Sequence, residues 1–167
     1  MLELMKAGAR PESTAWRKTT PPQFEDFPVS TLYTGPHAPV NLRSNPEAHT
    51  YRTRLREGAK TPVNFAGHYI VVGWGCGTEC GSYMLIDATN GNVFDGPPGS
   101  DPGVSFRPNS SLFVVDTGSY GFFYPARYYH WKNGKLNLIY QQACRLTNGQ
   151  QECGCKDVQR LLFEAPN

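Results

Sequence analysis

Three Asn-Gly pairs in the second half of the chain limit its possible folds more than any other feature of the sequence. They are Asn90-Gly91, Asn133-Gly134 and Asn148-Gly149. Asn-Gly is a preferred sequence of the two-residue type I′ turn, because both positions require positive φ and the twist of that turn matches the twist of a β-hairpin. The chain is therefore predicted to form a series of antiparallel hairpins.

The spacing of apolar residues changes to a period of two from Gly67 onward, which is typical of strands. The segment 68–74 is apolar on both faces, as expected for a central strand that is covered on both sides. Gly (17) and Pro (14) make up close to a fifth of the 167 residues, which suits turn-rich β-structure. The predicted strands span residues 68–74, 83–88, 92–94, 112–116, 127–132 and 135–142.

One helix is predicted before the strands, over residues 46–57. Pro46 suits the first helical position and Gly58 can end the helix. Arg52 and Arg56 lie together on a face that is most simply explained as solvated, although it could bind a phosphate or a carboxylate. A single apolar stripe is formed by Ala48, Tyr51 and Leu55.

These elements predict the α+β class, dominated by β-structure. We expect one twisted, mostly antiparallel sheet or partly closed barrel of about six strands, with one N-terminal helix. Residues 1–23 are expected to be a flexible N-terminal arm, or residues not native to the protein, and residues 24–167 a single domain. Prolines make the chain up to Asn45 loosely ordered in this interpretation. The side chains expected to pack it on the domain are Phe24, Phe27, Leu32 and Tyr33.

Charge and hydropathy limit the possible partners and locations. The chain has 16 Lys and Arg against 14 Asp and Glu, a formal net charge of +2, which gives no electrostatic case for a nucleic-acid partner. Apolar runs such as 69–72 are far shorter than the ~20 residues of a membrane-spanning helix, so no membrane insertion is expected. Residues 1–10 contain no signal-peptide core. The chain is thus either cytoplasmic or the mature part of an exported protein.

The most unusual stretch is NFAGHYIVVGWGCGTECG, residues 64–81, where four glycines surround one tryptophan and two cysteines. Glycines at a strand end indicate a tight, bent loop. Cys76 and Cys80 lack the second ligand pair typical of zinc sites and the C-x-x-C spacing of thiol redox enzymes. We predict no metal or other cofactor, and a disulfide between these two cysteines.

A cysteine nucleophile is the alternative. It would use Cys76 or Cys80 with His68 or His130 as the base, in a small envelope hydrolase or thiol enzyme. A straight strand separates His68 from Cys76 by eight residues, or roughly 27 Å. The chain would have to fold back sharply to bring them together, and nothing in the sequence places His130 beside Cys76.

The remaining three cysteines lie near the C-terminus. If Asn148-Gly149 forms a two-residue turn, Cys144 faces Cys153 across a hairpin, where a disulfide is compatible with the spacing. Cys155 is then left over, and pairing of Cys144 with Cys155 or an intermolecular bond stays open. Disulfides of this kind indicate an oxidising compartment, so a periplasmic or secreted location is expected.

Several motifs together resemble a family of small exported bacterial proteins of unknown function. They are NFAGHY, WGCGTEC, LIDATNGNVF, SFRPNSSLFVV and RYYHWKNGKL, and the resemblance covers about Phe24 to Leu138. It implies a periplasmic location after signal-peptide cleavage and a β-rich domain with the cysteine loop at Cys76 and Cys80. It implies no activity for any residue. The chain departs from this family in lacking a leader and in its cysteine-rich tail after Gln142.

The segment 120–129 contains six aromatic residues, of which most are expected in the core and some at the surface. Exposed Tyr, Trp and Arg beside a glycine-rich loop favour a contact surface for a protein or glycan. The expected function is a non-enzymatic binding module of the cell envelope, of the inhibitor or immunity type, that binds and occludes a protein partner. Its expected binding residues are Trp74, Gly75, Gly77, Tyr120, Phe123, Tyr124 and Arg127.

Overall fold

The computed structural model describes residues 20–77, 80–98, 103–115, 126–147 and 150–156. Within these residues the chain forms a short 3-10 helix, one α-helix and eight strands. The helices are η1 (Phe24–Asp26) and α1 (Arg52–Gly58). The strands are β1 (Tyr69–Gly77), β2 (Cys80–Asp87), β3 (Val93–Asp95), β4 (Val104–Phe106), β5 (Leu112–Val115), β6 (Arg127–Lys132), β7 (Lys135–Thr147) and β8 (Gln150–Lys156).

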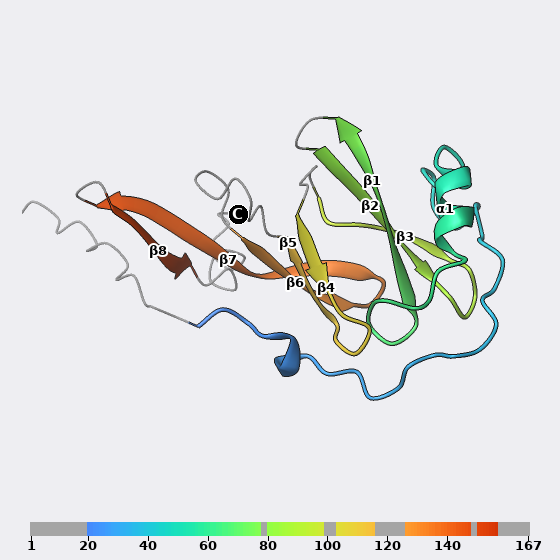
Figure 1. Ribbon diagram of the computed structural model, residues 1–167, viewed down its shortest axis with the longest axis horizontal. Coiled ribbons are helices and arrows are strands. Elements are labelled where there is room, and N and C mark those ends of the chain that lie inside the picture. Colours follow the sequence, from blue (N-terminus) through green and yellow to red (C-terminus); the bar gives the residue numbers. More distant parts are fainter. Residues whose placement is uncertain (1–19, 78–79, 99–102, 116–125, 148–149, 157–167) are drawn as a thin grey trace, which may run out of the picture.

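The described strands form two antiparallel sheets, with the strand orders β1-β2-β3 and β4-β5-β6-β7-β8. The first sheet lies between α1 and the second sheet (Figure 1). The β-dominated α+β class is confirmed. The expectation of one sheet or a partly closed barrel is wrong, because the strands divide into two sheets and neither closes on itself within the described residues.

The chain leaves the first sheet where proline removes the donors that a strand ladder needs. Gly96, directly after β3, still donates its amide hydrogen to the carbonyl of Tyr83 at 3.1 Å. Pro97 and Pro98 follow and have no amide hydrogen to donate. The ladder of the first sheet therefore stops here, and the later strands pair among themselves.

Residues 70–72 of β1 are buried on both faces, as the apolar run predicts, but β1 is an edge strand of its sheet, so the expectation of a central strand is wrong. Ile70 and Val72 pack in one cluster with Leu55 of α1. Val71, which lies between them in sequence, packs in a second cluster with Phe113 of β5. Because alternate residues of a strand point to opposite faces, one face of β1 meets the helix and the other meets the second sheet.

The helix is shorter than predicted. It spans Arg52–Gly58, and residues 46–51 form turns instead. The buried side chain of Asn45 accepts a hydrogen bond from the amide of Glu47 at 2.8 Å and donates one to Asp95 of β3 at 2.7 Å. These bonds fix a side-chain turn where the sequence suggested a regular first helical turn.

The segment before α1 lies along the domain and is not loose, at least from η1 onward. It is held by hydrogen bonds from the amides of Val29, Tyr33, Ala38 and Asn41 to backbone carbonyls of later loops, at 2.7–2.9 Å. These bonds could not be predicted from the pattern of side chains, because donor and acceptor are both backbone groups. Leu32, expected to pack on the domain, is 48% exposed, whereas Tyr33 packs against the first core cluster. Residues 1–19 lie outside the described residues.

The Asn-Gly pairs form two kinds of turn. Asn133 and Gly134 both have positive φ, 56° and 71°, as the predicted type I′ turn requires. At the first pair only Gly91 has positive φ, 78°, and residues 88–92 separate β2 from β3, so the prediction of a two-residue type I′ turn is wrong there. There the carboxylate of Asp87 accepts the amide of Thr89 at 2.9 Å, and this side-chain bond widens the connection between β2 and β3.

Candidate functional site

The free end of the β1–β2 hairpin is the region that the glycines and cysteines single out. The two strands pair regularly as far as Gly75 and Gly81, after which the register shifts and Gly77 faces Cys80. Gly77 has φ of 141°, a conformation that glycine adopts readily. Cys76 and Cys80 are joined by a disulfide, so this prediction is confirmed. The hairpin end is thus bent and covalently closed.

Trp74 connects this end to the helix. It stands opposite Ser82, whose hydroxyl lies 3.4 Å from the Sγ atom of Cys76 and donates to it. Trp74 is half-buried, whereas Gly75, Cys76 and Gly77 are exposed. Trp74 packs against the core cluster that contains Leu55 of α1, so its indole lies on the side of β1 that faces α1.

Two residues of the helical segment pack on this indole. The ring centroids of Tyr51 and Trp74 are 4.6 Å apart, with 37° between the ring planes. The guanidinium carbon of Arg54 lies 5.9 Å from the centroid of the Trp74 ring, within range of a cation–π interaction. We call Tyr51, Arg54, Trp74 and the Cys76–Cys80 disulfide the Trp74 face.

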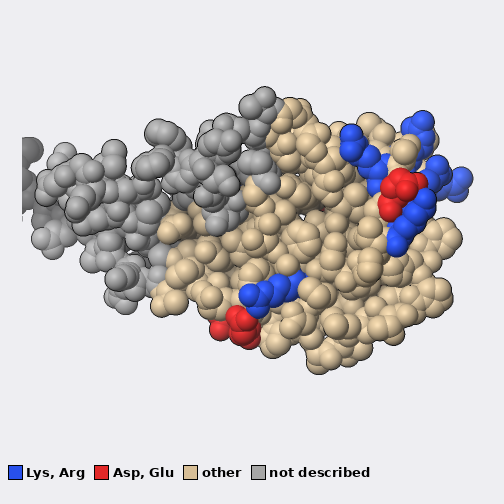
Figure 2. All heavy atoms as spheres, viewed as in Figure 1, with Lys and Arg blue, Asp and Glu red and all other residues tan. Residues whose placement is uncertain are grey.

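The surroundings of the Trp74 face are basic. Arg52, Arg54 and Arg56 of α1 are exposed, and Lys60 follows the helix, paired with Glu57 at 2.7 Å. Figure 2 shows Lys and Arg side chains gathered around acidic side-chain atoms at the end of the molecule that carries α1. Positive charge beside aromatic rings favours contact with an acidic surface.

The histidines proposed as catalytic bases lie away from the disulfide. His68 directly precedes β1, at the opposite end of the strand from Cys76, and its Nε2 atom lies 3.8 Å from the carboxylate of Asp87. His130 belongs to β6 in the second sheet, where its ring packs on Phe27 at 4.9 Å. The structure brings neither histidine to the Cys76–Cys80 pair.

The expected binding residues separate in the structure. Trp74, Gly75 and Gly77 lie on the last part of β1. Arg127 begins β6 and donates a hydrogen bond to the carbonyl of Pro98 at 3.2 Å. Tyr120, Phe123 and Tyr124 lie outside the described residues. Sequence reasoning missed Tyr51 and Arg54 as site residues, because only the packing of α1 on β1 joins them to Trp74.

The C-terminal hairpin has the predicted register. Thr147 faces Gln150, and Cys144 faces Cys153. Cys155 faces Gln142. The backbone thus places Cys144 and Cys153 opposite each other as expected, and the disulfide between them stays a prediction.

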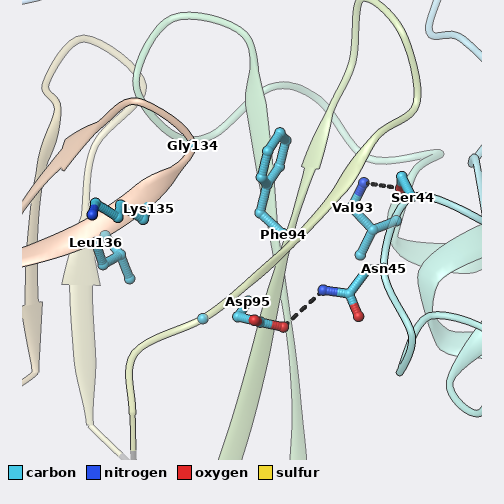
Figure 3. Close-up of a pocket in the computed structure, with 9 residues that line it drawn as sticks. Ser44, Asn45, Val93, Phe94, Asp95, Gly134, Lys135 and Leu136 are labelled. Atoms are coloured by element: carbon cyan, nitrogen blue, oxygen red, sulfur yellow. Dashed lines mark hydrogen bonds between the residues drawn. The ribbon is translucent and has the colours of Figure 1, made fainter.

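A hollow of about 300 Å³ lies between β3 and the β6–β7 turn (Figure 3). Phe94 and Leu136 are among its lining residues. The carboxylate of Asp95 turns toward Asn45, and the amide of Val93 donates to Ser44 at 2.8 Å. These polar groups serve to anchor the segment before α1, which makes the hollow a weaker candidate than the Trp74 face.

Comparison with known proteins finds no match among family models, curated proteins or solved structures. None of the described helices is long and apolar enough to cross a membrane. Nor do the described residues bring together three or more His, Cys, Asp or Glu side chains that could hold a metal ion.

Removing the disulfide is expected to lower the free energy of unfolding by about 2 kcal/mol, the entropy of closing a short loop in the unfolded chain. Urea unfolding of the Cys76→Ser/Cys80→Ser variant under non-reducing conditions measures this loss. Ser82→Ala, which removes only the hydroxyl beside Cys76, is the control and should stay within about 0.5 kcal/mol of wild type. Equal stability of all three proteins would contradict a stabilising bridge.

The environment of His130 predicts a pH dependence of stability. Burial lowers the pKa of His130, and the nearby positive charge of Lys132 lowers it further. As pH falls below the ordinary histidine pKa of ~6.5, the unfolded chain takes up a proton before the folded chain does, so stability decreases. Melting temperatures between pH 8 and pH 5 should fall less in His130→Asn than in wild type. Thr53→Asn, at an exposed position without a titratable group, should keep the wild-type slope.

Proposed function

We propose that this protein is a non-enzymatic binding module of the cell envelope, which docks on a protein partner through the Trp74 face. The observation that supports this most is the packing of Tyr51 and Arg54 on Trp74 beside a disulfide-closed hairpin end. Trp, Tyr and Arg are the residues that most often dominate the binding energy of protein interfaces.

The Trp74 face is held in one conformation before a partner binds. A disulfide closes the end of the hairpin, and the helix holds the indole of Trp74 in place. A surface that is already ordered loses less conformational entropy when a partner binds, so more of the contact energy appears as affinity. The hairpin end also projects from the body of the domain (Figure 1). A rigid projection suits the occlusion of a partner's site, which is the reason for proposing an inhibitor or immunity role.

Charge suggests the chemistry of the partner. The three exposed arginines of α1 and the single acid that pairs with Lys60 leave this surface positive. An acidic patch on the partner would complement it and speed association. The predicted partner is therefore an envelope protein with an acidic surface, and a disulfide-permitting compartment such as the periplasm is the proposed location.

The alternative function, a small envelope hydrolase or thiol enzyme, has less support from the site. A thiol enzyme needs a free thiolate, and the sulfur atoms of Cys76 and Cys80 are joined to each other. His68 lies at the other end of β1, roughly 27 Å away along an extended strand. Enzymatic use of this pair would require both reduction of the bridge and a large rearrangement of the hairpin.

The binding account is tested with single variants. A partner captured from periplasmic extract should bind Trp74→Ala about 30-fold more weakly than wild type, the loss of ~2 kcal/mol typical of a central aromatic residue. Arg54→Ala should also weaken binding, by about fivefold, and more salt should weaken wild-type binding. Isothermal titration calorimetry measures each dissociation constant.

A matched control is available at Arg107, just after β4 in the second sheet. Its guanidinium carbon lies 4.4 Å from the ring centroid of Phe24, so it also makes a cation–π contact. Arg107→Ala removes the same kind of side chain at a different site and should change the affinity by less than twofold. Equal losses from Arg107→Ala and Arg54→Ala would contradict a binding role for the Trp74 face.

A further inference from the structure

The register of the β7–β8 hairpin places three cysteines on one face of a two-stranded ribbon. Cys144 faces Cys153, and Gln142 faces Cys155. Directly opposed residues of an antiparallel pair share a face, and so do residues two apart in one strand. Cys144, Cys153 and Cys155 therefore occupy neighbouring positions on the same face.

Strand geometry makes two pairings compete for Cys153. Opposed Cα atoms of an antiparallel pair lie about 4.5–5.5 Å apart, inside the range of about 4.4–6.8 Å found for disulfides. Cα atoms two residues apart in one strand lie about 6.7 Å apart, at the upper end of that range. Cys144–Cys153 is thus the favoured bridge. Cys153–Cys155 is the second one, and it needs β8 to bend at Gly154, because a disulfide also requires Cβ atoms about 3.5–4.5 Å apart.

The part of the ribbon that carries Cys144 and Cys153 lies beyond the strand pairing of β6. β6 pairs with β7 only as far as Gln141, whereas the partners of β8 run from Gln141 to Thr147. Beyond Gln142, β7 is paired with β8 alone among the described strands, and this part of the hairpin extends past the other strands of the second sheet (Figure 1). Cys144 and Cys153 lie in this extension, and Cys155, which faces Gln142, lies where it begins.

We propose that Cys144, Cys153 and Cys155 form a thiol–disulfide exchange site. A disulfide of the compartment, RSSR, oxidises the thiols of Cys144 and Cys153 to a bridge and leaves as two RSH. The thiolate of Cys155 then attacks the sulfur of Cys153, so that a Cys153–Cys155 bond forms and the Cys144–Cys153 bond breaks. Cys144 leaves as a thiolate and takes a proton from water. One thiol and one disulfide are present before and after this step.

The same site would act on thiols from outside. A small or peptide thiol that attacks the Cys144–Cys153 bridge forms a mixed disulfide and frees one cysteine. The thiolate of Cys155 resolves a mixed disulfide on Cys153 by forming Cys153–Cys155 and releasing the external thiol. The substrate class is therefore an accessible thiol or disulfide. The Cys76–Cys80 bridge belongs to a different sheet and serves as an internal control.

The test uses oxidised and reduced glutathione as the probe. Full-length wild-type protein is incubated with the pair at pH 8, and samples are alkylated at intervals and mapped as peptides. We expect Cys144–Cys153 as the main bridge, a second population with Cys153–Cys155, and glutathione on these three cysteines alone. Cys155→Ser and Cys155→Ala should lose the second population and accumulate the glutathione adduct, while circular dichroism stays as in wild type.

Two results would overturn the proposal. One is a single Cys144–Cys153 pairing in wild type at every time point, with Cys155 alkylated in every molecule. The other is glutathione exchange at Cys76–Cys80 as fast as at the C-terminal cysteines, because the reaction would then not depend on the third cysteine.

Discussion

Replacing Gly91 with alanine is expected to lower the free energy of unfolding by roughly 3 kcal/mol or more, from backbone strain and steric overlap together. Gly91 has φ of 78°, where an L side chain is strained. A Cβ atom at this position would overlap the carbonyl oxygen of Pro39. The residue has little freedom to move away, because its amide donates to Asp87 at 2.8 Å and its carbonyl accepts from Asn41 at 2.8 Å.

Urea unfolding followed by circular dichroism measures this effect, and Gly75→Ala is its control. A Cβ atom at Gly75 meets only the carbonyl of Cys80 at an ordinary 3.9 Å, and this glycine is exposed. Its substitution should change stability by less than about 1 kcal/mol. Unfolding of both variants at the same urea concentration would contradict the close packing of the segment before α1 on the β2–β3 loop.

The second large effect is expected from Asp87→Ala, with a loss of about 3 kcal/mol. Asp87 is buried, with 6% of its surface exposed. Its carboxylate accepts three hydrogen bonds, from the amide of Thr89 at 2.9 Å, the hydroxyl of Thr89 at 2.6 Å and the side-chain amide of Asn90 at 3.0 Å. Alanine would leave these donors without their acceptor and would free the loop that positions Gly91.

Urea unfolding measures the loss of stability in Asp87→Ala, and Glu57→Ala is the control. Glu57 is exposed and pairs with Lys60 on the surface, so its removal should cost no more than about 0.5 kcal/mol. A loss in Asp87→Ala as small as that in Glu57→Ala would show that the carboxylate does not organise the loop.

Local chemistry explains which features could be predicted from the sequence. The Asn133-Gly134 turn fixes the β6–β7 hairpin, and counting outward from the third Asn-Gly pair places Cys144 opposite Cys153, as the register confirms. The Cys76–Cys80 bridge also follows from residues close in sequence. In each case the residues that decide the structure lie within a few positions of one another.

The features that could not be predicted depend on contacts between distant segments. Pro97 and Pro98 end the ladder of the first sheet, but the packing of the second sheet on one face of β1 depends on distant strands, and a buried run of apolar residues fits one sheet as well as two. The start of α1 is set by the bond between Asn45 and Asp95, 50 residues apart. The Trp74 face likewise forms only when α1 lies on β1, so Tyr51 and Arg54 carry no signal of their own in the sequence.

The most direct test of the binding account is site-specific photo-crosslinking in the native host. A photoreactive phenylalanine analogue replaces Arg56 on α1 in one strain and Ser105 on β4, an exposed residue of the second sheet, in another. The account predicts one discrete adduct with an envelope protein from position 56, its loss when Trp74→Ala is added, and no such adduct from position 105. The same adduct from both positions, or an adduct at position 56 that persists in Trp74→Ala, would contradict it.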